Sequence, residues 1–130
     1  MKQLTSLDAS FYYLESYRTP MHVGGVYVFE NPNPEKQFDY QAFKNYIGSR
    51  LLRFPVFRQR LVEVPLDLGH PYWFDDPDFE LDFHITHVAL PPPADTAELL
   101  RLAARFFSRP LDKQRPLWEV MVAEGLKMPG

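Results

Sequence analysis

Proline is the residue that most restricts what this chain can fold into. The sequence of 130 residues contains 13 prolines, about twice the usual share of ~5%. Proline breaks the interior of a helix and is excluded from the centre of a sheet, because it lacks a backbone donor and its ring clashes with the preceding turn. The sequence therefore predicts short elements with abrupt ends and argues against a bundle of long helices.

The overall composition is typical of a folded, soluble protein. Hydrophobic residues make up 45% of the chain and aromatic residues 15%, which is too apolar for intrinsic disorder. The chain has no cysteine, which excludes disulfides and thiolate metal sites. A net charge of −3 argues against a nucleic-acid partner. We expect one folding unit over residues 1–130.

The sequence offers neither a signal peptide nor a membrane span. Residues 1–10 lack the apolar run of a signal peptide, and no stretch approaches the ~18 consecutive apolar residues needed to cross a bilayer. We therefore expect a cytoplasmic protein, with peripheral contact to a membrane or lipid body left open.

Hydrophobic periodicity and stop signals predict three helices and five strands. The helices are expected after Thr5 or Ser6, after Asp39 and after Asp95, and the strands over Met21–Glu30, Phe57–Val64, Pro71–Phe74, Phe79–Thr86 and Leu117–Glu124. This order predicts an α/β fold, a mixed-sheet two-layer sandwich.

Two of these strands are predicted to be central and one to lie at the surface. Met21–Glu30 and Leu117–Glu124 are apolar on both faces, as in a strand covered on both sides. Phe79–Thr86 alternates apolar and polar residues, which predicts one buried face and one wet face carrying His84. Within the first strand, Gly24 and Gly25 indicate close packing or the lining of a substrate channel.

The polar residues do not assemble a catalytic site by spacing alone. His84 and His87 are expected on opposite faces of a strand, which predicts no shared metal ion. Asp75, Asp76 and Asp78 fit a solvated turn better than a pair of acid–base carboxylates. The sequence contains neither a Gly-x-Ser-x-Gly elbow nor a glycine-rich phosphate loop.

Four arginines form the one basic stretch of the chain. They are either solvated side chains or include one that faces a carboxylate or an anionic ligand, which the planar guanidinium binds in a bidentate manner. Trp118 is expected to anchor the core. The four arginines are Arg50, Arg53, Arg58 and Arg60.

Four ordered blocks resemble the N-terminus of bacterial wax ester synthase/diacylglycerol acyltransferases. The resemblance covers essentially the whole chain, and the block containing Pro116, Leu117 and Trp118 matches a structural motif of that family. The blocks are Leu7–Phe11 with Pro20–Gly25, Phe57–Leu61, Ser108–Asp112 and Arg115–Val120.

The resemblance implies a fold and an activity. The family is similar to the chloramphenicol-acetyltransferase-like acyltransferases, so the chain is expected to form the N-terminal part of such a lobe. Their His-His-x-x-x-Asp-Gly motif supplies a general base that activates the acceptor hydroxyl toward an acyl-CoA thioester. This sequence lacks the motif, so no catalytic residue is expected in this chain. We expect the motif in polypeptide that follows residue 130.

The same resemblance implies the partners. Acyl-CoA is expected as a substrate, with a long-chain alcohol or diacylglycerol as the acceptor, and no bound cofactor. Two alternatives remain open: a condensation-like enzyme that uses carrier-protein thioesters, and a non-catalytic lipid-binding or scaffold module. Arg58 takes the place of an arginine that in condensation domains pairs with the aspartate of the histidine motif, which implies that Arg58 supports that motif.

Overall fold

Short helices and strands follow one another along the chain in a computed structural model that describes residues 2–3, 24–31, 35–63 and 69–127. The predicted helix after Thr5 or Ser6 lies outside the described residues. The elements are β1 (Lys2–Gln3), α2 (Tyr40–Leu51), the 3-10 helix η1 (Pro55–Arg58), β2 (Gln59–Val62), β3 (Tyr72–Asp75), α3 (Leu81–His84), β4 (Ile85–Ala89), α4 (Thr96–Phe107) and β5 (Val120–Glu124).

The strands form two small sheets. One is antiparallel with the order β1-β3-β2, and the other is the parallel pair β4-β5. Leu61 lies opposite Trp73 in the first sheet, and Ile85 lies opposite Val120 in the second. The α/β class is therefore confirmed, but in the described part of the chain the strands do not merge into one mixed sheet.

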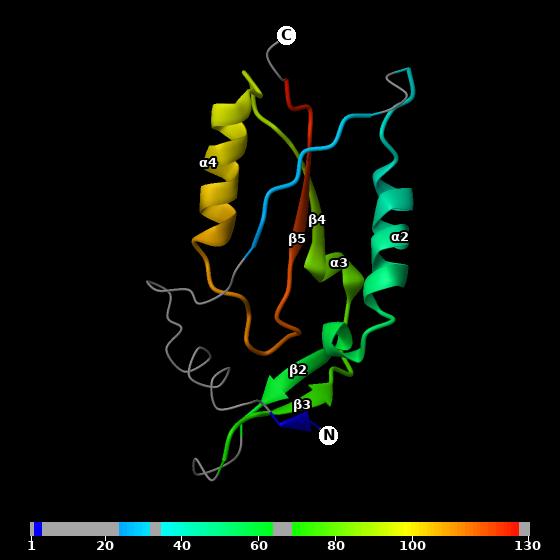
Figure 1. Ribbon diagram of the computed structural model, residues 1–130, viewed down its shortest axis with the longest axis vertical. Helices are drawn as coiled ribbons and strands as arrows, with labels where there is room; N and C mark the ends of the chain where they lie inside the picture. The colour runs from blue at the N-terminus through cyan, green and yellow to red at the C-terminus, as the bar shows by residue number, and fades with distance from the viewer. Residues whose placement is uncertain (1, 4–23, 32–34, 64–68, 128–130) are drawn as a thin grey trace.

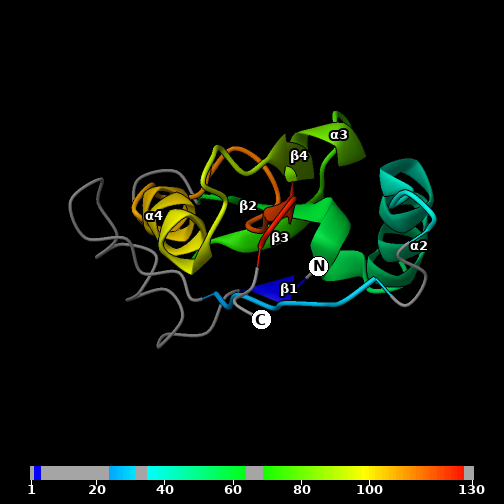
Figure 2. The same cartoon turned by 90° about the horizontal axis from the view of Figure 1, so that it is seen from above.

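The two long helices flank the parallel pair. α4 lies on one side of β4 and β5 and α2 on the other, while β2 and β3 lie at one end of the pair (Figure 1). The view from above agrees, and it places residues 24–31 along a single face of the molecule (Figure 2). α4 makes the connection between β4 and β5, as a parallel pair requires.

The two predicted helix caps that lie within the described residues are confirmed. The Asp39 carboxylate accepts a hydrogen bond from the backbone N–H of Ala42 at 3.0 Å, and the Asp95 carboxylate accepts one from Glu98 at 3.0 Å. Each cap satisfies a donor that the first helical turn leaves without an intrahelical partner. The predicted apolar stripe of α4, which contains Leu102 and Phe106, is half-buried.

The antiparallel hairpin was also predicted, although its first strand begins later than expected. β2 and β3 pair across the loop that contains Gly69. Residues 55–58 form η1 instead of strand, because Pro55 has the fixed φ that suits the first position of a helical turn. Pro55 therefore begins an element here, while α2 has already ended at Leu51.

The prediction of a buried central strand over Met21–Glu30 is wrong for the residues described. Residues 24–30 have no strand hydrogen bonding, and Tyr27 and Phe29 are 80% and 85% exposed. A continuous run of apolar residues indicates a segment that tends to be covered by other atoms. It does not determine whether a neighbouring strand is present to pair with that segment. Leu117–Glu124 is confirmed as a strand from Val120 onward, but the prediction that it is central is wrong for the described residues, where β5 is half-buried and belongs to a two-stranded sheet.

The prediction of one regular strand over Phe79–Thr86 is also wrong. Leu81–His84 form a single helical turn, and the strand begins only at Ile85. A helical turn rotates successive side chains by about 100° instead of alternating them. His84, expected on the wet face, is consequently 1% exposed.

The buried core of the described residues is small and lies where the elements meet. Leu61 packs against Trp73 and Leu117, which joins the antiparallel sheet to the segment that leads into β5. α2 approaches α3 closely, since a Cβ placed on Gly48 would lie 2.6 Å from Cδ2 of Leu81. None of the described helices is long and apolar enough to cross a bilayer.

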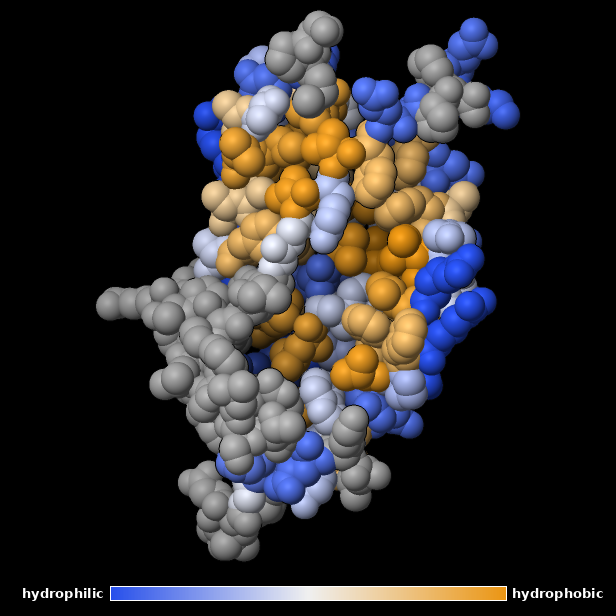
Figure 3. Space-filling model, viewed as in Figure 1, coloured by the Kyte–Doolittle hydropathy of each residue, from blue (hydrophilic) through white to orange (hydrophobic). Residues whose placement is uncertain are grey.

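One face of the molecule carries a large apolar surface. Space-filling representation shows hydrophobic residues gathered between the two long helices (Figure 3). Val26 and Val28 on this face are 46% and 53% exposed, in addition to Tyr27 and Phe29. Contiguous apolar surface of this kind is typical of regions that contact other protein or lipid.

We therefore predict that residues 1–130 expressed alone will self-associate. Replacing Tyr27 and Phe29 together by serine should reduce the association, because it removes the most exposed aromatic rings. Light scattering coupled to size-exclusion chromatography measures the mass. A monomeric wild-type fragment that unfolds cooperatively would contradict the prediction.

Candidate functional site

Trp118 connects three parts of the fold. Its indole N–H donates a hydrogen bond to the carbonyl of Phe57 at 2.9 Å, and its own backbone carbonyl lies 2.7 Å from Nδ1 of His84. The indole is stacked on the His84 ring, with 4.6 Å between centroids and 17° between planes, and meets Phe57 edge-on. Trp118 thus acts as the predicted core anchor.

The two residues before Trp118 hold the same segment in place. Pro116 is buried and accepts a backbone hydrogen bond from Trp118 at 3.0 Å, while Leu117 packs on Leu61. The predicted block of Pro116, Leu117 and Trp118 therefore has a packing role in this structure. It fixes how the chain enters β5.

His84 is a buried neutral base in this arrangement. Because a carbonyl only accepts, Nδ1 of His84 must carry the proton that it donates to Trp118. Burial lowers the pKa of His84 below its ordinary value, and the hydrogen bond to the Trp118 carbonyl opposes this only in part. The His84 ring is stacked on Trp118 and also on Phe79, with 5.2 Å between the His84 and Phe79 ring centroids.

His87 belongs to a different cluster. Its Nε2 contacts the Glu124 carboxylate on β5, and its ring is stacked on Tyr40 with 4.1 Å between centroids. The Tyr40 hydroxyl donates to the carbonyl of Ile85 at 3.0 Å, which ties α2 to β4. The structure therefore does not bring His84 and His87 together. In the described ranges, no three metal-ligating side chains gather at one point.

Asp76 and Asp78 lie in the turn that the sequence predicts, whereas Asp75 is the last residue of β3. The Asp76 carboxylate accepts a hydrogen bond from the backbone N–H of Asp78 at 2.9 Å, and Asp75 accepts one from Gln59 across the sheet at 3.2 Å. These contacts shape the backbone and leave no pair of carboxylates facing one another for acid–base work.

The four arginines of the basic stretch are spread over the surface. Arg50 lies over the Tyr46 ring at 5.0 Å, while Arg53 and Arg58 are exposed and Arg60 is half-buried. The backbone of Arg58 is fixed, because its carbonyl accepts a hydrogen bond from Asp76 at 2.9 Å. Its side chain forms no ion pair within the described residues.

Gly24 is placed at a point of close approach. A Cβ at this position would lie 2.2 Å from the Phe107 ring, so only glycine fits without displacement. This contact supports the packing interpretation of Gly24. Gly25 is exposed beside Tyr27, and neither glycine lines the cavity of the described residues that is considered next.

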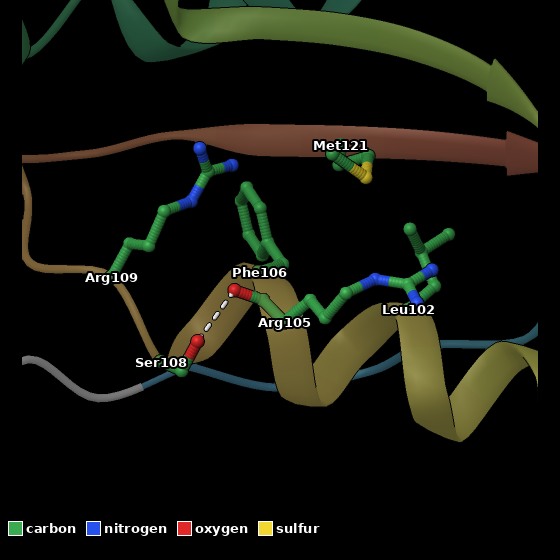
Figure 4. Close-up of a pocket in the computed structure, with 6 residues that line it drawn as sticks. All are labelled: Leu102, Arg105, Phe106, Ser108, Arg109 and Met121. Atoms are coloured by element: carbon green, nitrogen blue, oxygen red, sulfur yellow. Dashed lines mark hydrogen bonds between the residues drawn. The ribbon is translucent and has the colours of Figure 1, made fainter.

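A cavity of about 430 Å³ lies between the end of α4 and β5. Figure 4 shows Phe106 rising from α4 toward β5, with the Arg105 and Arg109 side chains on either side of it. The Ser108 hydroxyl donates to the Arg105 carbonyl at 2.9 Å and so fixes the end of the helix. The lining residues are Leu102, Arg105, Phe106, Ser108, Arg109 and Met121.

The sequence interpretation did not identify this cavity. Arg109 was noted only as part of a block that resembles a family, and Arg105 was not singled out. Arg105 lies in the last turn of α4 and Arg109 follows its C-cap, Ser108, so helical spacing alone does not bring the two together. Met121 comes from a distant strand, so no local pattern places it beside them.

The lowered pKa of His84 predicts how the free energy of unfolding depends on pH. The folded pKa is lowered from 6.5, so the unfolded chain binds a proton more readily than the folded chain. The free energy of unfolding should therefore fall as pH drops through 6.5, and this contribution should vanish above it. His84→Asn should lack this component, because the amide keeps a donor for the Trp118 carbonyl but has no titrating ring.

Urea unfolding of the full-length protein, measured from about pH 8 to about pH 5, compares the two proteins. Parallel pH profiles for wild type and His84→Asn would contradict the assignment.

The comparisons with known proteins agree with one another. Residues 4–129 match the model of the wax ester synthase/diacylglycerol acyltransferase catalytic domain. A probable diacylglycerol O-acyltransferase of Mycobacterium tuberculosis, tgs3, is 42% identical over 125 residues, which cover 96% of this chain and 45% of that protein. A second such protein of the same species, tgs1, is 43% identical over 128 residues, covering 97% of this chain and 27% of its own length.

A solved structure supports the same relationship. The wax ester synthase/diacylglycerol acyltransferase from Marinobacter aquaeolei VT8 superposes with a TM-score of 0.75 at 34% identity, over 98% of this chain and 30% of that one. The chain thus spans less than half the length of each of these three proteins. It belongs to the wax ester synthase/diacylglycerol acyltransferase catalytic domain family.

Proposed function

We propose that this chain is the N-terminal part of an acyltransferase that makes wax esters or triacylglycerol from acyl-CoA and a long-chain alcohol or diacylglycerol. The observation that carries the proposal is the match of residues 4–129 to the family's catalytic domain. The names of the relatives, diacylglycerol O-acyltransferase and wax ester synthase, favour this reaction over transfer from carrier-protein thioesters.

The reaction requires a base that these residues do not supply. In the proposed step the acceptor hydroxyl loses its proton, its oxygen attacks the thioester carbonyl, and the carbon–sulfur bond breaks to release coenzyme A as the thiol. His84 is unsuited to take that proton, because the residue is 1% exposed and its remaining basic nitrogen, Nε2, is therefore closed off from a substrate hydroxyl. We expect the base on the polypeptide after residue 130, in the histidine motif.

This chain contributes the support for that polypeptide. Trp118 fixes the start of β5 against Phe57 and His84, and the parallel pairing with β4 sets the direction in which the chain leaves β5. A positioned base must lie within hydrogen-bond reach of the hydroxyl that it activates. A rigid β5 therefore helps to determine where the catalytic segment begins.

Acyl transfer is tested directly with the full-length protein. Mixed with a long-chain acyl-CoA and either hexadecanol or diacylglycerol, it should release free coenzyme A and form ester in equal amounts, measured by a thiol reagent and by lipid chromatography. Turnover only with a carrier-protein thioester would favour the condensation-like alternative. Lipid binding without turnover would favour the scaffold.

A second prediction concerns Arg58. We propose that its exposed guanidinium binds the aspartate of the histidine motif, so Arg58→Ala in the full-length enzyme should abolish most activity. The pair would be buried beneath the polypeptide that follows residue 130, and loss of one partner from such a buried pair costs about 3–5 kcal/mol. Arg58→Lys should restore little, because lysine lacks the planar fork.

Arg60→Ala is the matched control, since Arg60 lies two residues away on β2 opposite Phe74 and should have a milder effect. Turnover and melting temperature are measured for all three variants. If Arg58→Ala has near-normal turnover and melting temperature, the proposed pairing is wrong and Arg58 is an ordinary surface arginine.

A further inference from the structure

The cavity between α4 and β5 combines positive charge with an apolar lining. Arg105 and Arg109 supply two guanidinium groups, while Leu102, Phe106 and Met121 supply apolar surface. Neither arginine forms an ion pair with any residue that the structure describes. Arg101, one turn earlier on α4, differs because it is paired with Glu98. Among the described residues, therefore, no carboxylate pairs with either of the two cations at the cavity.

The arrangement of these groups restricts the ligand. In the close-up the Arg109 guanidinium lies near β5 on one side of Phe106, and the Arg105 side chain runs along α4 toward Leu102 on the other side (Figure 4). Guanidinium groups bind phosphate through paired, charge-assisted hydrogen bonds, and a nucleobase stacks on an aromatic side chain. A nucleotide whose ribose carries phosphates at two positions offers both kinds of contact, phosphates for the two arginines and a base for the aromatic ring.

The size of the cavity favours a small molecule over a membrane surface. Its volume of about 430 Å³ falls within the ~300–1,000 Å³ range of small-molecule sites. A bilayer is flat, so its headgroups would meet the rim of such a hollow and leave Met121 on β5 uncontacted. The cavity thus fits one molecular group that enters it.

We propose that this cavity binds the nucleotide end of coenzyme A, with Arg105 and Arg109 on its phosphates and Phe106 beside the adenine. Coenzyme A carries a phosphate on the 3′ oxygen of its ribose and a diphosphate on the 5′ side, so one adenosine has phosphates in two directions. The inference rests on the proposed function, because that function supplies an acyl-CoA substrate. The cavity then sets the affinity for the donor and takes no part in breaking the thioester.

The experiment uses the full-length protein with Arg105→Gln, Arg109→Gln and the double variant. Arg101→Gln is the matched control, because it removes a charge from the same helix outside the cavity. Calorimetry measures the Kd of coenzyme A and of dephospho-coenzyme A, which lacks the 3′-phosphate. Steady-state kinetics then give KM for acyl-CoA and kcat separately.

We expect the double variant to weaken coenzyme A binding by about tenfold or more, as the loss of charged hydrogen bonds does. KM for acyl-CoA should rise in proportion, with kcat little changed. Wild type should prefer coenzyme A to dephospho-coenzyme A, and one of the single variants should lose this preference. Arg101→Gln should behave as wild type.

Several results would overturn the inference. The first is an unchanged Kd for coenzyme A in the double variant, and the second is an equally large effect of Arg101→Gln. The third is a double variant that no longer binds phosphatidic acid vesicles but still binds coenzyme A as wild type does. If a glutamine variant fails to fold, Arg105→Lys and Arg109→Lys replace it, because lysine keeps the charge and lacks the planar fork. If both lysine variants still prefer coenzyme A to dephospho-coenzyme A as wild type does, the result contradicts paired arginine contacts. A protein that binds coenzyme A through these arginines but transfers no acyl group would refute the proposed function and leave this site standing.

Discussion

The contacts of Trp118 are the interaction on which the rest of the structure depends. One side chain spans 61 positions of sequence to reach the carbonyl of Phe57, and the backbone of the same residue reaches His84 across 34. These contacts join η1, which leads into the antiparallel sheet, the helical turn before β4 and the segment that leads into β5. The two sheets share little else in the described core, apart from the packing of Leu61 with Trp73 and Leu117. Without Trp118, each sheet would be too small to hold itself together.

Features that depend on neighbouring residues could be predicted from the sequence. Asp39 and Asp95 cap helices because a carboxylate three residues before a free backbone donor is a local arrangement. The β2–β3 hairpin was predicted for the same reason. The failures involve distant partners. His84 is buried and does not lie on the predicted solvent-exposed face, because the distant Trp118 accepts its hydrogen bond and stacks on its ring. Residues 24–30 are exposed because no strand in the described structure pairs with them.

The same distinction applies to the functional residues. Pro116, Leu117 and Trp118 were found because they form one contiguous motif, and the structure gives them a packing role. The α4–β5 cavity was not found, because Met121 approaches Arg105 and Arg109 only after β5 has paired with β4. Sequence motifs indicate the family, and the fold brings two arginines from the end of α4 together with a methionine from β5 at one cavity.

The parallel pairing of β4 and β5 has a consequence for synthesis. β4 cannot find its described partner until α4 and the following loop have been made, and the His87–Glu124 contact closes across 37 positions. At ~5–20 residues per second, a ribosome needs on the order of seconds to deliver that stretch. Through most of this interval His84 lacks the Trp118 carbonyl that accepts its hydrogen bond, and the edge of β4 that pairs with β5 is open. An open strand edge can pair with another chain, so the nascent chain is exposed to association until β5 has been made.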